Sequence, residues 1–235
     1  MKNIFRCCSL LVLFVFTASA ADAQIINYDS LVQALPKEKS DAIYSLTEKS
    51  EAMQSRGETD SAIMANQIIT SILPNFAPAY VTIAGLYGSK LQFRDEIVWA
   101  NRAIAADSNY INGYINLGNA YASMRSYDTA TRIYMTASFV DPQSPVPAYS
   151  LGVLLEEQGE FNAALKNYLQ SARIDTMFEP AVYNAAMMYA NLKKYPEAKA
   201  MLRHALRISP YDKDVETEYK AIEKEEKEAG EKKKK

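Results

Sequence analysis

A period of 34 residues constrains the fold of this chain more than any other feature of its sequence. Residues 113–130 read GYINLGNAYASMRSYDTA, and a shift of 34 positions places Leu117 and Gly118 on Leu151 and Gly152. Self-similarity at a fixed period of this length is typical of arrays in which each unit packs mainly on its neighbours. The same pattern recurs without insertion at Ile83, Ala84, Ala185 and Ala186.

Each period predicts two antiparallel helices. It holds two runs of about 13 residues with apolar side chains at i, i+3, i+4 and i+7, separated by turn residues such as those at 56–58 and 158–160. A small side chain in the first run lets the second helix cross close to it, because a bulky one would hold the axes apart. These small residues are Ala84, Gly118, Gly152 and Ala186, and a second set, Ala103, Ala137, Ser171 and Ala205, does the same for the following unit.

The residues of the third period resemble the tetratricopeptide repeat (TPR) family. The matching positions are Tyr114, Leu117, Gly118, Tyr121, Tyr127, Ala130, Tyr134, Ala137 and Pro142. The resemblance implies an all-α fold, a right-handed superhelical solenoid of five helix-turn-helix units at residues 43–76, 77–110, 111–144, 145–178 and 179–210. Departures from the family pattern are local. Ser108 and Thr176 replace the usual closing proline, and Ala100 replaces a large residue with Trp99 beside it. Ala148 is small where an aromatic is common, and Thr59 interrupts the inter-helix aromatic of the first unit.

Both ends of such an array need caps with a polar outer face. Residues 211–235 predict a C-terminal capping helix, since Val215, Tyr219 and Ile222 share one side of an otherwise charged segment, followed by a lysine-rich tail. Residues 24–42 predict a lead-in helix, with Pro36 starting the long first helix of unit one.

Residues 1–23 are typical of a Sec-type signal peptide. Lys2 and Arg6 precede an apolar run at residues 7–18, and small residues then allow cleavage near Ala20 or Ala23. The run is too short to span a bilayer of roughly 30 Å. We therefore expect export, with the bacterial periplasm or cell envelope as the destination, and no integral membrane segment in the mature chain. The alternative is an uncleaved anchor.

The sequence offers few places for catalysis. It has no phosphate-binding glycine loop and no metalloprotease motif, and its only histidine, His204, has no evident partner. Both cysteines, Cys7 and Cys8, lie in the signal peptide, so the mature chain has no thiol. We expect no enzyme activity, cofactor or metal. The net charge of -2 also disfavours a nucleic-acid partner.

The informative surface is the inner face of the array, where the first helices of the units line a groove. In the family, positions flanking the Leu-Gly pair contact a protein or an extended peptide. Here these candidates are Ile115, Asn116, Asn119, Tyr149, Ser150, Val153, Tyr183, Asn184 and Met187, with Val81, Thr82 and Gly85 in unit two. Amides could bond to a peptide backbone and aromatics could bury side chains. The alternative is that the asparagines tie neighbouring helices together.

Three functions follow. The first is an exported scaffold that binds a protein segment in its groove. The second is a structural component of a secretion or outer-membrane assembly machine that binds through its convex face or its termini. The third is a glycan- or cell-wall-binding module. The sequence names no partner, since the groove residues of repeat arrays obey no fixed code.

Overall fold

The computed structural model describes residues 28–232, and all of their regular structure is helical. The expected signal peptide and the last three lysines lie outside these residues. After a short helix at residues 28–33, the helices are α2 Lys37–Ser55, α3 Thr59–Ile72, α4 Ala77–Ser89, α5 Phe93–Ala106, α6 Ile111–Ser123, α7 Tyr127–Val140, α8 Val146–Glu157, α9 Phe161–Ile174, α10 Glu179–Asn191, α11 Tyr195–Ile208 and α12 Lys213–Lys232. The expected all-α solenoid is confirmed.

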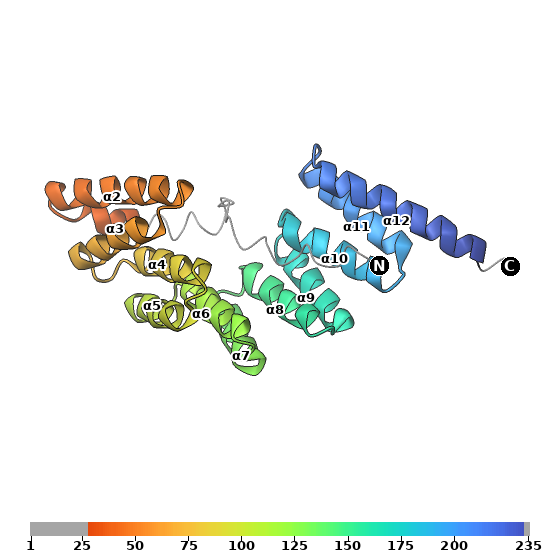
Figure 1. Cartoon of the computed structure of the whole chain (residues 1–235), viewed down its shortest axis with the longest axis horizontal. Helices are drawn as coiled ribbons and strands as arrows, with labels where there is room; N and C mark the ends of the chain where they lie inside the picture. The colour runs from red at the N-terminus through yellow and green to blue at the C-terminus, as the bar shows by residue number, and fades with distance from the viewer. Residues whose placement is uncertain (1–27, 233–235) are drawn as a thin grey trace.

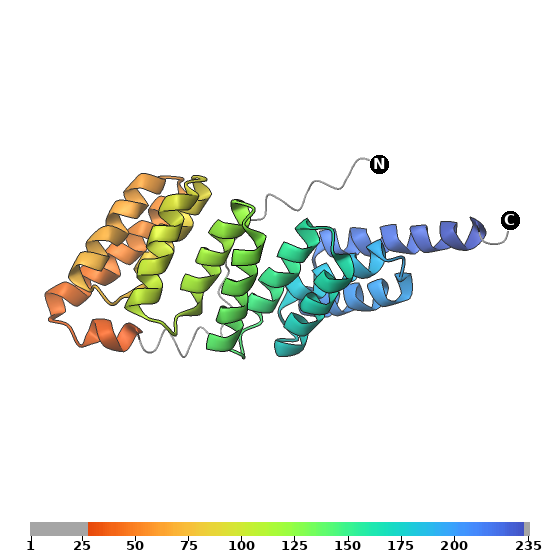
Figure 2. The ribbon, with the colours of Figure 1, turned by 90° about the horizontal axis from the view of Figure 1, so that it is seen from below.

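The helices pair in chain order and stack into an arc (Figure 1). Each even-numbered helix from α2 to α10 packs against the helix that follows it, and α12 closes the array against α11. Neighbouring first helices also touch, since α6 contacts both α4 and α8. Figure 1 shows α4 and α6 on the inner side of the arc and α5 and α7 on its outer side, while Figure 2 shows the pairs side by side along the length.

The Leu-Gly signature is explained by an aromatic ring that fills the space of a missing side chain. A Cβ built on Gly118 would lie 2.3 Å from the ring of Tyr134, and one on Gly152 would lie 2.6 Å from the ring of Tyr168. Real Cβ atoms essentially never come this close to another heavy atom, so both positions require glycine while the ring is present. Where the first helix carries alanine instead, the cluster contains a smaller partner: Ala84 packs with Ala100, and Ala186 packs with Leu202.

The turn inside each unit repeats one backbone conformation. Five residues spaced by 34 have positive φ, near +58° or +75°: Gly57, Leu91, Arg125, Gly159 and Lys193. This left-handed conformation ends a helix and favours glycine, because a Cβ crowds the following carbonyl there. Two units use glycine, and three tolerate a larger residue.

Unit two contains a buried carboxylate where every other unit has alanine. Glu96 is 5% exposed and stands at the position of Ala62, Ala130, Ala164 and Ala198. Its carboxylate lies over Gly88, where an added Cβ would be 2.8 Å from one of its oxygens. The missing side chain of Gly88 therefore makes room for the carboxylate, and burial raises the pKa of Glu96 from 4.5 to about 8.

Both ends of the array are sealed by apolar contacts. Near the N-terminus Val32 packs with Ile43 and Ile69, and the long first helix begins directly after Pro36. At the C-terminus Val215 and Ile222 of α12 are 2% and 3% exposed and join the cluster of unit five.

The lead-in segment also braces the first two unit junctions. Tyr28 lies edge-on to Phe76 and Tyr110, each with ring centroids 5.4 Å apart, and its hydroxyl donates to Asp107 at 2.5 Å. Phe76 and Tyr110 immediately precede α4 and α6. Tyr28 therefore contacts the starts of two consecutive units.

Candidate protein-binding groove

The candidate groove is formed by the first helices α4, α6, α8 and α10. The residues that flank the Leu-Gly pair recur on these helices every 34 positions. The structure divides them into residues used for packing and residues that retain partial exposure.

Ile115 belongs to the core. It is 4% exposed and packs with Tyr134 of α7 and Leu154 of α8. A side chain so deeply buried has little surface left for a ligand, so Ile115 joins units three and four and is removed from the groove. The sequence could not predict this burial, because Ile115 lies next to Asn116 and flanks the same Leu-Gly pair.

The asparagines of unit three make hydrogen bonds within the array. The Asn116 amide donates through Nδ2 to the backbone carbonyl of Val81 at 3.0 Å, which ties α6 to α4. Asn119 accepts a 2.6 Å bond at Oδ1 from the hydroxyl of Tyr134, which ties α6 to α7. Both side chains are half-buried. The alternative interpretation, in which the asparagines join neighbouring helices, describes these contacts.

A second hydrogen bond between first helices joins units four and five. The Nδ2 of Asn184 donates to the Tyr149 hydroxyl at 3.3 Å, across 35 positions of the chain, which is also the separation of Asn116 and Val81. Tyr149 itself lies edge-on to Phe178, with ring centroids 5.5 Å apart, and 5.6 Å from the ring of Tyr168. Tyr149 and Asn184 therefore have a structural role at this junction.

The remaining candidates form a mixed strip on α8 and α10. Ser150, Val153, Tyr183 and Met187 are all half-buried. Val153 and Met187 pack against the cluster around Tyr168, and Tyr183 packs against the cluster of unit five. We call these four residues the inner strip. It offers a hydroxyl, two aliphatic or thioether side chains and a phenol, with no charged side chain among them.

In unit two the same face is open. A Cβ on Gly85 would meet only the Nδ2 of Asn116, at 3.9 Å, which is an ordinary contact distance. Thr82 turns its hydroxyl back to the carbonyl of Pro78 at 3.0 Å. The inner face therefore has room beside α4.

The phenols behind this face are fixed as neutral donors. Burial raises the pKa of Tyr134, and burial together with the hydrogen bond to Glu156 raises the pKa of Tyr168. The Tyr168 hydroxyl donates to the Glu156 carboxylate at 2.6 Å. Their hydrogen bonds therefore persist across the neutral pH range.

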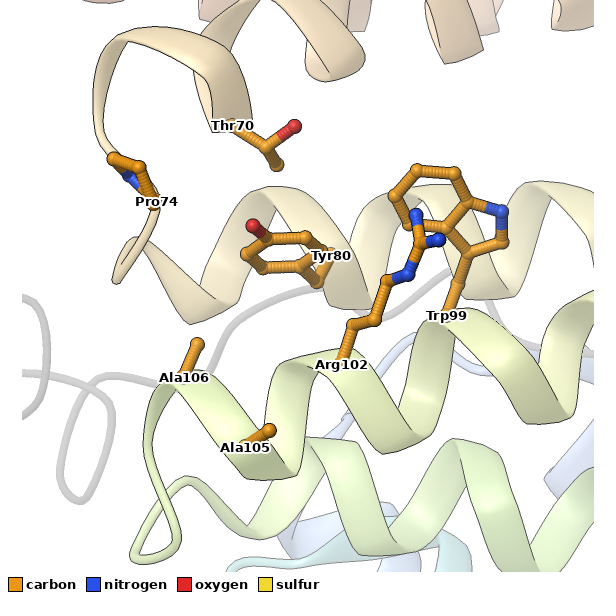
Figure 3. Close-up of a pocket in the computed structure, with 7 residues that line it drawn as sticks. All are labelled: Thr70, Pro74, Tyr80, Trp99, Arg102, Ala105 and Ala106. Carbon is orange, nitrogen blue, oxygen red and sulfur yellow. The ribbon is translucent and has the colours of Figure 1, made fainter.

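A hollow that the sequence did not indicate lies between α3, α4 and α5. Its lining comes from the end of α3, the start of α4 and the outer side of α5, with a volume of about 380 Å³ (Figure 3). The lining residues are Thr70, Pro74, Tyr80, Trp99, Arg102, Ala105 and Ala106. In the sequence Trp99 stands out only as the neighbour of Ala100, where the repeat pattern has a large residue. The spacing of Trp99 and Arg102, one helical turn apart, was the signal that could have indicated it.

No group of histidine, cysteine, aspartate and glutamate arranged to hold a metal occurs within residues 28–232. The same part of the chain contains no helix that is both long enough and apolar enough to cross a membrane.

Comparison with known proteins finds other tetratricopeptide repeat proteins. The segment that contains α10 and α11 matches a protein-family model. Residues 179–212 match the tetratricopeptide repeat. Tetratricopeptide repeat protein 6 of Homo sapiens is 26% identical over an alignment of 150 residues that covers 59% of this chain and 27% of that protein. This chain thus spans little more than a quarter of that relative. Both matches are to TPR proteins and support the resemblance to the TPR family.

Solved structures show the same fold. The thermophilic TPR protein TTC0263 of Thermus thermophilus superposes with a TM-score of 0.64 and 18% identity, covering 77% of this chain and 98% of its own. YrrB, described as a TPR protein with an unusual peptide-binding site, gives a TM-score of 0.50 at 20% identity, covering 87% of this chain and 100% of its own. At this identity the likeness shows that the chain shares the TPR fold.

Proposed function

We propose that the protein is an exported TPR scaffold whose inner face binds an extended protein segment. The observation that carries this proposal is the inner strip, Ser150, Val153, Tyr183 and Met187, which keeps partial exposure on two neighbouring first helices. Half-buried aromatic and thioether side chains bury further apolar area when a partner covers them. Export is supported by the signal-peptide pattern of residues 1–23.

The hydrogen bonds between neighbouring first helices help binding because they hold the inner strip in one shape before the ligand arrives. Asn184 and Tyr149 hold α10 against α8, and the Tyr149 ring is clamped by Phe178. A surface that is already ordered loses less conformational entropy when its ligand arrives. The expected ligand is a segment with uncharged apolar side chains, since the strip has no charged side chain to attract either sign.

The test compares variants of the inner strip with a variant on the outer side. The mature chain carrying Ser150→Arg and Met187→Glu should fail to capture the partner that the unchanged chain captures from bacterial envelope extract. Met135→Glu is the matched control, because Met135 of α7 is 60% exposed. Thermal melts select a temperature at which every variant is folded. Retention of the same partner by the inner-strip variant contradicts the proposal.

One observation favours the second function, a structural component that docks by its outer side. Met135 and Phe139 are one turn apart on α7 and are 60% and 87% exposed. Paired apolar side chains on the surface are typical of docking sites. Under this function Met135→Glu, rather than the inner-strip variant, abolishes capture, so the same experiment separates the two proposals.

A further inference from the structure

The hollow formed by α3, α4 and α5 has an aromatic wall. The rings of Tyr80 and Trp99 lie with centroids 6.0 Å apart and planes inclined by 30°. Figure 3 shows Tyr80 in the middle of the hollow, with Pro74 beyond one end and Trp99 at the other. Both rings are half-buried, so each retains a face or an edge that a bound group can cover.

A cation stands at the rim of this wall. The guanidinium carbon of Arg102 lies 4.2 Å from the centroid of the Trp99 ring. None of the ion pairs formed within residues 28–232 includes Arg102, and it is the single charged residue of the lining. A guanidinium carries five N–H donors along its edge, and a cation–π contact does not use them as hydrogen-bond donors. That edge matches a carboxylate, which can accept two parallel bonds.

The arrangement is specific to this junction. One, two and three periods further on, the position of Trp99 carries Ile133, Asn167 and Met201, and the position of Arg102 carries Thr136, Gln170 and His204. Packing of the solenoid therefore requires neither residue. Trp99 and Arg102 form a local addition to unit two that the repeat does not account for.

The rest of the lining sets the shape of the ligand. Pro74, Ala105 and Ala106 are small or apolar, and Pro74 and Ala106 lie on the far side of Tyr80 from Arg102 (Figure 3). The hollow is a trough with Arg102 and Ala105 exposed at its rim, whereas sites for small molecules bury most of the ligand. A polypeptide that crosses the trough fits better than an enclosed small molecule.

We propose that this trough binds an internal peptide segment with a large apolar residue two positions from an aspartate or glutamate. Residues one helical turn apart, such as Arg102 and Ala105, lie about 5–6 Å apart. Side chains two positions apart on an extended strand point the same way and lie about 6.6 Å apart. The carboxylate would bond to the edge of Arg102 while the apolar side chain enters between Tyr80 and Pro74. This site is separate from the inner strip and does not depend on it.

The single tryptophan of the chain, Trp99, provides a direct signal. The probe is a blocked peptide with Phe-Ser-Glu at its centre, titrated against the full mature chain while tryptophan fluorescence is recorded. Anisotropy of a dye-labelled copy gives a second measure of binding. We expect saturable binding, with an affinity about tenfold lower for Arg102→Gln because a charge-assisted pair is lost. Arg94→Gln, an exposed arginine on the same helix, is the matched control and should bind normally.

Three outcomes overturn the proposal. The first is a peptide with glutamine in place of glutamate that binds equally well. The second is an equal loss of affinity in Arg94→Gln and Arg102→Gln. The third is binding confined to a peptide that ends in a free carboxyl group after phenylalanine, which would make the ligand a chain terminus. Ser150→Arg should leave the titration unchanged, so failure here is distinct from failure of the proposed inner-face function.

Discussion

At the scale of single residues, the fold depends on pairs in which one side chain is absent so that another fits. Gly118 with Tyr134, Gly152 with Tyr168 and Gly88 with Glu96 are three such pairs. In each of them the larger partner occupies the space in which a Cβ would stand. Substitution of the glycine is therefore the sharpest test of each contact.

Gly118→Ala should lower the free energy of unfolding by about 1–3 kcal/mol, since the added methyl overlaps the Tyr134 ring. Gly85→Ala, also inside a first helix but with only an ordinary contact to Asn116 at 3.9 Å, should raise it by about 0.5–1 kcal/mol. Urea unfolding of both variants measures the difference. Equal effects of the two substitutions would contradict the packing explanation of the Leu-Gly signature.

The buried carboxylate of Glu96 should make stability depend on pH. Its pKa is about 8 in the folded chain against an ordinary value of 4.5, so the folded state retains a proton that the unfolded state releases between these values. Stability should therefore fall as pH rises from about 4.5 to about 8 and level off above, by about 1.4 kcal/mol per unit of pKa elevation.

The matched variant for this prediction is Gly88→Ala with Glu96→Ala, which installs the alanines that unit three has at residues 122 and 130. It should unfold at a higher urea concentration than the unchanged chain at pH 8, with a flatter pH profile. A profile that keeps its slope in the double variant would show that another group titrates.

At the scale of elements, the sequence predicted most of the helix pairs because each has its own apolar period and turn. It could not predict which half-buried polar residue contacts a neighbouring helix. Asn116 was a groove candidate, yet its amide donates to the Val81 carbonyl at 3.0 Å, because the stacking of units places α4 next to α6. The burial of Ile115 could not be predicted either, because it depends on Leu154 of the next unit.

The left-handed turn residue inside each unit gives a prediction for one element. Lys193→Gly should raise the free energy of unfolding by about 0.5–1 kcal/mol, because glycine adopts the φ of 58° found there without steric cost. Asn191→Gly, exposed at the end of α10, should lower it instead. Thermal melts of the two variants give the comparison. Destabilisation by Lys193→Gly would mean that the lysine side chain contributes more than the backbone strain.

At the scale of the whole molecule, stability comes from stacking, and the terminal helix α12 protects the last unit. Ile222→Asp should detach α12 and expose the cluster around Val182 and Leu202, with a loss of about 2 kcal/mol or more. Lys224→Asp, on the exposed side of the same helix, is the control. Hydrogen exchange should accelerate first in α10 and α11. Uniform acceleration along the array would argue against unit-by-unit stability.

The central claim is that the inner strip holds the partner, and photocrosslinking tests it most directly. A photoreactive amino acid is placed at Ser150 on the inner face or at Met135 on the outer face, in the full chain expressed in its own cells. Crosslinks should form from Ser150 and be absent from Met135, with mass spectrometry locating an uncharged apolar segment of the partner. Crosslinks from Met135 alone would contradict binding at the inner face.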